Sequence, residues 1–105
     1  MADPSKRLMF LEKVTRDGSK DPLAWYGLAL EYKNLERPED ALKTFEQLRE
    51  INGEYVPTYL MCGQMLAALG RKDEARAWLE SGIAKAEATG NSHAAGEMES
   101  ALAGL

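Results

Sequence analysis

Residues 22–55 read PLAWYGLALEYKNLERPEDALKTFEQLREINGEY, and residues 56–89 read VPTYLMCGQMLAALGRKDEARAWLESGIAKAEAT. The two segments are equal in length and match when one is placed on the other. Trp25 then falls on Tyr59, and small residues likewise fall on small ones. A fixed period of this length is typical of a stacked array, in which each unit buries its apolar face against its neighbours.

The sequence pattern predicts six helices joined by short turns, and no alternating run of residues indicates a strand. The clearest helix start is Asp21-Pro22, because aspartate caps backbone N–H groups and proline at the first helical position loses no hydrogen bond. Short connections make neighbouring helices antiparallel. The expected helices run over about 5–16, 22–34, 38–51, 57–69, 72–89 and 92–104.

Composition places the chain among ordinary soluble globular proteins. Of its 105 residues, 29% are charged, the formal net charge is −4, and no basic stripe suited to nucleic acid is visible. The single cysteine, Cys62, allows no internal disulfide, which fits a reducing compartment. The apolar run at 8–11 is too short for a secretory signal or for the roughly 20 residues of a membrane span. We therefore expect a cytoplasmic protein that binds neither nucleic acid nor membrane.

The two segments resemble tetratricopeptide repeats, whose pattern has a large aromatic residue at position 4, Leu at position 7, an aromatic residue at position 11, an aromatic residue or Leu at position 24, and small residues at positions 8 and 20. In the first segment these positions hold Trp25, Leu28, Tyr32 and Phe45, with Ala29 and Ala41 as the small residues. In the second they hold Tyr59, Cys62, Leu66 and Leu79, with Gly63 and Ala75. Leu48 and Gly82 depart from the alanine usual at position 27. The resemblance implies an all-α fold, in which antiparallel helix hairpins stack into a right-handed solenoid.

The same resemblance divides the single domain expected over residues 1–105. The first repeat covers 22–55 and the second covers 56–89. A half-repeat helix at 5–17 precedes them, and a capping helix at 91–104 follows. Two repeats alone would expose apolar ends, so we expect the flanking helices to be needed for stability.

No combination of residues points to catalysis, a cofactor or a metal. His93 is the only histidine, it follows Ser92, the expected N-cap of the last helix, and it has no partner at metal-ligand spacing. Cys62 occupies a position that the repeat reserves for packing, so we expect a buried thiol rather than a nucleophile. Glu46 and Glu50 share one helical face, which we expect to be a solvated outer surface. We therefore predict a protein that is not an enzyme.

The resemblance also implies a concave groove, lined by the first helix of each repeat, that binds peptides. The positions that line it are mostly apolar here, and an apolar face outside the core must be covered by something. That cover is either the C-terminal helix or an apolar or amphipathic segment of a partner protein. The candidate groove residues are Leu23, Tyr26, Leu30, Lys33, Asn34, Leu60, Met61, Gln64, Ala67, Ala68 and Met98.

Family members that grip acidic C-termini carry Lys at position 5 and Asn at position 9. This chain instead has Tyr26 and Leu30 in the first repeat, and Leu60 and Gln64 in the second. The pattern therefore predicts an adaptor that binds a peptide or helix of a partner protein without such a clamp. Two alternatives are a self-associating unit whose apolar ends or groove meet in a homodimer, and an accessory subunit of a larger complex.

Overall fold

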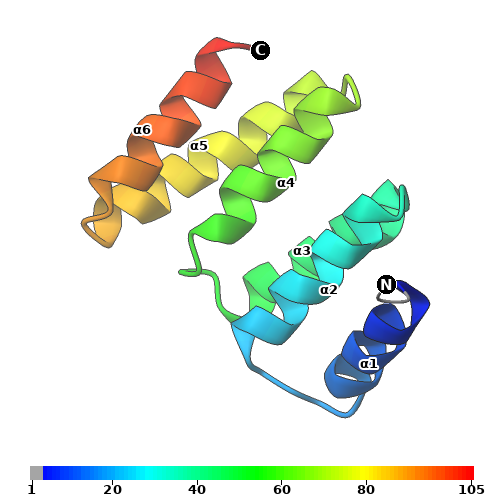
Figure 1. Cartoon of the computed structure of the whole chain (residues 1–105). Helices are drawn as coiled ribbons and strands as arrows, with labels where there is room; N and C mark the ends of the chain where they lie inside the picture. The colour runs from blue at the N-terminus through cyan, green and yellow to red at the C-terminus, as the bar shows by residue number, and fades with distance from the viewer. Residues whose placement is uncertain (1–3) are drawn as a thin grey trace. The chain divides into compact units, whose positions relative to one another are not determined.

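The computed structural model describes residues 4–105, with side chains from residue 6 onward, and its described residues form helices and no strand (Figure 1). Every expected helix is present, and the all-α fold is confirmed. The helices are α1 (Pro4–Arg16), α2 (Pro22–Asn34), α3 (Pro38–Ile51), α4 (Pro57–Ala68), α5 (Lys72–Ala88) and α6 (Ser92–Ala103).

The helices form two compact units that divide after Gly53. In unit 1, α2 and α3 form an antiparallel hairpin, and α1 packs against α2. In unit 2, α4 and α5 form the hairpin, and α6 packs chiefly against α5 and also touches α4. The expected repeat boundaries stay predictions, as does the single domain over 1–105, whose residues 1–3 lie outside the described chain.

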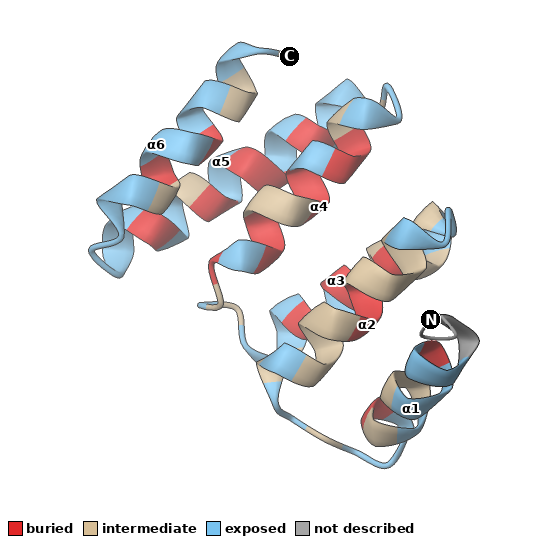
Figure 2. Ribbon diagram, viewed as in Figure 1, coloured by how far each residue is buried: buried red, intermediate tan, exposed pale blue. Residues whose placement is uncertain are grey.

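The buried residues lie along the sides of the helices that face each other within each unit (Figure 2). Most repeat positions are buried, although Trp25 and Tyr32 are only half-buried. Burial of a large apolar side chain contributes about 1.5–3 kcal/mol. The buried apolar residues of unit 1 are Leu8, Leu28, Ala29, Ala41, Phe45 and Leu48. Those of unit 2 include Val56, Tyr59, Cys62, Met65, Leu66, Ala75, Trp78, Leu79, Ala86, Ala95 and Met98.

The turn inside each hairpin is built in the same way. The backbone N–H of Arg37 donates to the carbonyl of Tyr32 at 2.8 Å, and at the equivalent place in the second hairpin Arg71 donates to Leu66 at 2.9 Å. Each arginine side chain then pairs with the carboxylate three residues further on. The period read from the sequence therefore extends to the hydrogen bonds of the turns.

The helix starts follow the expected capping chemistry with one correction. Asp21 caps α2, because its Oδ1 accepts the N–H of Leu23 at 3.0 Å. The expected cap of α6, Ser92, is wrong. Asn91 takes this role, because its side-chain oxygen accepts the N–H of Ala94 at 3.1 Å and Ser92 already lies inside the helix.

Two glycines let the helices of unit 2 approach closely. A Cβ built on Gly63 would lie 2.7 Å from the Leu79 side chain, so glycine at this position lets α5 lie closer to α4. A Cβ on Gly82 would overlap the Sδ of Met98 and the Cβ of Tyr59. The departure from alanine at Gly82 thus has a physical reason, since α4, α5 and α6 meet at its bare backbone.

Candidate functional site

In unit 1, the predicted groove residues lie on α2, the first helix of the hairpin. Leu23 is 65% exposed in the first turn, where its side chain has no core to enter. Tyr26, Leu30 and Lys33 are half-buried, and Asn34 is exposed at the end of the helix. We call these five residues the α2 face. It presents apolar side chains along the helix and polar groups at its C-terminal end.

In unit 2, the corresponding residues lie on α4. Leu60, Met61 and Ala67 are half-buried, whereas Gln64 and Ala68 are exposed. We call these five residues the α4 face. Because α6 packs chiefly against α5, it leaves Gln64 and Ala68 uncovered. The apolar part of this face is therefore accessible in part.

Met98 does not belong to such a surface. Its side chain is fully buried (0% exposed), and it packs over Gly82 beside Tyr59 in the core of unit 2. The α6 helix thus contributes Met98 to stability, and this residue is not available to a ligand.

The α2 helix is held by polar contacts with α1 and with the following turn. Arg7 pairs with Glu31 at 3.1 Å, and the Tyr32 hydroxyl donates to Glu12 Oε2 at 2.5 Å. The Arg37 guanidinium lies over the Tyr32 ring, 4.6 Å from its centroid. Burial, and then the hydrogen bond with Glu12, raise the pKa of Tyr32 from 10.0 to about 12. The contacts with Arg7 and Glu12 hold α2 against α1 without using the α2 face.

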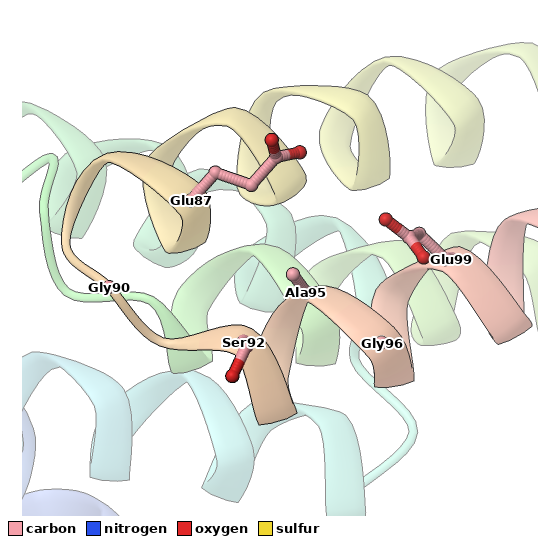
Figure 3. A pocket seen from close by; sticks show the side chains of 6 residues that line it. All are labelled: Glu87, Gly90, Ser92, Ala95, Gly96 and Glu99. Atoms are coloured by element: carbon pink, nitrogen blue, oxygen red, sulfur yellow. The ribbon is translucent and has the colours of Figure 1, made fainter.

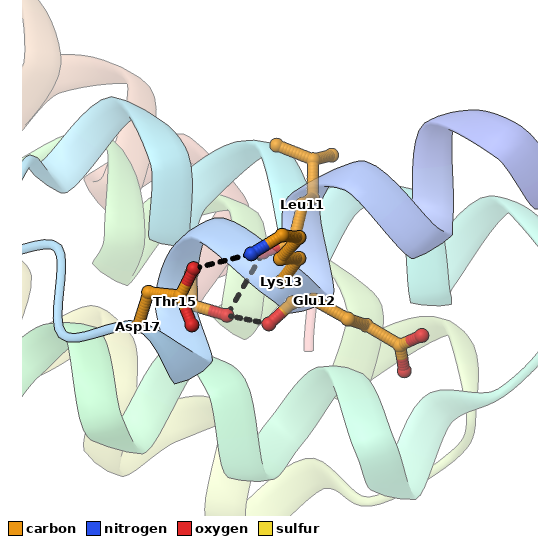
Figure 4. A network of polar contacts seen from close by, with 5 residues as sticks. All are labelled: Leu11, Glu12, Lys13, Thr15 and Asp17. Atoms are coloured by element: carbon orange, nitrogen blue, oxygen red, sulfur yellow. Dashed lines mark hydrogen bonds and ion pairs between the residues drawn. The ribbon is translucent and has the colours of Figure 1, made fainter.

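Near the C-terminal end of α1, Thr15 lies on the buried side of the helix and Lys13 on the exposed side (Figure 4). The buried Thr15 donates its hydroxyl to the carbonyls of Leu11 at 2.9 Å and Glu12 at 3.1 Å. The exposed Lys13 pairs with Asp17 at 2.8 Å. Because the pair is exposed and lies within one turn of chain, it contributes little to stability and leaves Lys13 able to find other partners.

Sequence reasoning missed an exposed apolar pair on the outward side of α1. Met9 and Phe10 are each 66% exposed. Lys6 and Lys13 lie one turn before and one turn after them, at helical spacings that place all four residues on one side. We call these four residues the basic-apolar face of α1. Their spacing was the signal that could have found it.

Sequence reasoning also missed a hollow of about 440 Å³ in unit 2, between the end of α5 and α6 (Figure 3). Glu87 of α5 and Glu99 of α6 stand at its rim and point toward one another, with Ala95 between them. Neither carboxylate has an ion-pair or hydrogen-bond partner among residues 4–105. The residues that line this acidic hollow are Glu87, Gly90, Ser92, Ala95, Gly96 and Glu99.

The residues considered for chemistry lie on three helices: His93 on α6, Cys62 on α4, and Glu46 and Glu50 together on α3. His93 is exposed and lies 2.9 Å from Glu97, while Cys62 is fully buried. Glu46 and Glu50 are exposed on α3, as expected of an outer surface. Within residues 4–105, no group of three or more His, Cys, Asp or Glu side chains is placed to hold a metal ion. None of the helices in this range is long and apolar enough to cross a membrane.

Comparison with known proteins identifies the family. The tetratricopeptide repeat family model matches residues 34–96. A crystal structure of a tetratricopeptide repeat domain protein from Salinibacter ruber is 33% identical, with a TM-score of 0.70 over 78% of this chain and 91% of that chain. A solution NMR structure of a tetratricopeptide repeat domain protein from the same organism, also 33% identical, gives 0.74 over 78% of this chain and 83% of that chain. The comparison with curated proteins found no match. Repeats of this kind generally mediate protein–protein interaction, and the chain belongs to the tetratricopeptide repeat family.

Proposed function

We propose that this chain is an adaptor that binds a peptide or helix of a partner protein through the α2 face and the α4 face. One observation carries the proposal: the first helix of each hairpin keeps apolar side chains partly exposed after its unit has folded. Leu23 and Leu30 do so on α2, and Leu60 and Met61 do so on α4. Each face contributes its own contacts to the partner segment.

The distribution of apolar residues supports this role. On α3 the buried residues Ala41, Thr44, Phe45 and Leu48 form one stripe, and the exposed residues of the helix are polar. By contrast, α2 and α4 are apolar on more than one side, although the hairpin buries only part of that surface. An apolar helix surface beyond the core stripe favours a partner that covers it.

The chemistry of the faces defines the partner segment. It needs apolar side chains to pack beside Leu30 and Met61, and polar groups to pair with Lys33, Asn34 and Gln64. An amphipathic helix or an extended peptide supplies both. No step of this role involves covalent chemistry, so the proposed adaptor is not an enzyme. The reduced, buried state of Cys62 is compatible with a place in the cytoplasm.

Charge substitutions on the two faces test the proposal. Leu30→Glu with Met61→Glu would place one carboxylate on each face, whereas Gln47→Glu with Ser81→Glu adds the same charges at exposed positions on α3 and α5. Proteins captured from native lysate by the unsubstituted chain and by the control, but not by the Leu30/Met61 variant, are the candidate partners. Far-UV circular dichroism checks that both variants keep their helices.

Affinity for an identified partner then separates the two faces. We expect Leu30→Glu and Met61→Glu each to weaken binding about tenfold or more, because each buries an uncompensated charge at the contact. The control pair should leave the affinity unchanged. Equal affinity of the Leu30/Met61 variant and the control for every captured protein would refute the proposed faces.

A further inference from the structure

We propose that this chain self-associates head to tail, with the basic-apolar face of α1 in one copy docked on the acidic hollow of the next copy. This contact involves neither the α2 face nor the α4 face, so it goes beyond the proposed adaptor function. Three observations carry it: an apolar pair with basic flanks on α1, an open hollow with an acidic rim between α5 and α6, and their opposite charges.

The basic-apolar face is exposed, whereas the opposite side of α1 packs against α2. Leu8 is buried on the opposite side of the helix, whereas Met9 and Phe10 keep two thirds of their surface in contact with water. Both residues of the pair are large: Met9 is unbranched and Phe10 is aromatic. They project from a helix that polar contacts hold against α2. Aromatic and methionine side chains of this kind are enriched at the centres of protein interfaces.

The electrostatics of α1 select an acidic partner. Lys6 and Lys13 flank the apolar pair, and Arg16 is exposed one turn beyond Lys13. The one carboxylate within α1, Glu12, accepts the hydrogen bond from Tyr32 and is half-buried. Lys13 pairs with Asp17 just beyond the helix, so the positive charge of the outward side of α1 comes chiefly from Lys6 and Arg16, in a chain whose net charge is −4. Basic flanks around an apolar pair favour a surface with an apolar floor and an acidic rim.

The acidic hollow has that construction. Glu87 and Glu99 stand at its rim, and Ala95 and Gly96 line it with small side chains or none. A Cβ built on Gly96 would meet nothing within 4 Å, so the space above this residue is open. The sequence of α6 contains no lysine or arginine that would neutralise the rim.

The sizes and charges of the two surfaces match. A cavity of about 150 Å³ accepts a benzene ring, so a hollow of about 440 Å³ has room for the side chains of Phe10 and Met9. The Lys6 and Lys13 side chains are long enough to place their ammonium groups near Glu87 and Glu99. Because the two surfaces differ, the contact is heterologous, and each bound copy still presents one unused surface of each kind.

A mixing experiment tests the proposal on the full chain. Met9→Glu with Phe10→Glu blocks the α1 surface and leaves the hollow intact. Gly96→Trp places an indole in the hollow and leaves α1 intact, and the Cβ of the new side chain would meet nothing within 4 Å. Gln47→Glu with Ser81→Glu, which adds two carboxylates at exposed positions outside both surfaces, is the matched control. Circular dichroism verifies the helical content of each variant before sedimentation velocity is measured.

The expected results distinguish head-to-tail association from other dimers. The sedimentation coefficients of the unsubstituted chain and of the Gln47→Glu/Ser81→Glu control should rise with concentration up to about 1 mM, which covers weak affinities. Each blocked variant alone should stay monomeric, while an equimolar mixture of the two should form a dimer and no larger species. Added salt should shift the mixture back toward monomer, because it screens the paired charges.

Three outcomes would overturn the proposal. The first is an unsubstituted chain that stays monomeric over the whole concentration range. The second is a mixture of the two blocked variants that forms no dimer. The third is a blocked variant that still dimerises alone, which would indicate a symmetric contact. None of these outcomes affects the adaptor function, since the test of that function substitutes Leu30 and Met61.

Discussion

Glu36 and Gly70 occupy the same place in the two hairpins, and both adopt the left-handed backbone conformation, with φ of 59° and 78°. The N–H of Glu36 donates to Lys33 at 3.1 Å, and that of Gly70 donates to Ala67 at 3.0 Å. Glycine adopts this conformation freely, whereas a residue with a Cβ is strained there. The first hairpin therefore keeps strain at a turn where the second has none.

We predict that Glu36→Gly stabilises the chain by about 1 kcal/mol, because it removes the left-handed strain of an exposed side chain. Gly70→Ala should destabilise it by a similar amount, because it introduces that strain. Urea unfolding followed by circular dichroism measures both, and the slope of the transition should stay unchanged. A lower unfolding midpoint for Glu36→Gly would show that the Glu36 side chain makes a stabilising contact that outweighs the strain.

At two further glycines, both inside helices, substitution by alanine should have opposite effects on stability. Gly82→Ala should destabilise the chain by about 1–3 kcal/mol, because its Cβ would overlap Met98 and Tyr59. Gly96→Ala should stabilise it by about 0.5–1 kcal/mol, because alanine favours the helix and its Cβ meets nothing. Thermal or urea unfolding of the two variants checks this contrast. Equal effects of the two substitutions would contradict the packing at Gly82.

The raised pKa of Tyr32 predicts a loss of stability at high pH. The folded protein holds the Tyr32 proton more tightly than the unfolded chain, so this contribution is fully present below pH 10 and is lost as the pH rises toward about 12. The phenolate absorbance of the unsubstituted chain minus that of Tyr32→Phe gives the titration of this hydroxyl. We expect a midpoint near 12.

Glu12→Gln provides the control for that titration. It keeps a hydrogen-bond acceptor but removes the negative charge that opposes phenolate formation, so the pKa of Tyr32 should fall part of the way toward 10.0. Burial is the larger cause and should keep the value above 10.0. An unchanged titration in Glu12→Gln would mean that the carboxylate does not act on Tyr32.

Local signals were sufficient to predict the helices. Asp21 and Pro22 marked the start of α2, and the repeat period transferred the interior pattern of one hairpin to the other. The 34-residue period gave a wrong prediction for the exposure of Met98 on α6. It places Met98 at the position of the exposed Gln64, but α6 begins from its own cap at Asn91 and turns Met98 into the core. A helix outside the repeat thus needs its own register, which depends on the preceding turn.

The two surfaces of the head-to-tail contact could not be predicted in the same way. Apolar spacing on α1 identifies the inward stripe through Leu8 and Leu11, but the exposure of Phe10 depends on what packs beside the helix. The acidic hollow depends on how the end of α5 lies against α6, and no single segment of sequence contains that arrangement. Glu87 and Glu99 belong to different helices and meet only through the turn at Gly90.

The packing at Gly82 also determines the C-terminal boundary of any fragment of unit 2 that is to be transferred to another protein. Met98 from α6 covers this glycine, so a fragment that stopped after α5 would open the centre of the hairpin to water and lose a fully buried side chain. The smallest transplantable piece of unit 2 is thus three helices, and its downstream junction belongs after Ala103 rather than at the end of the second repeat.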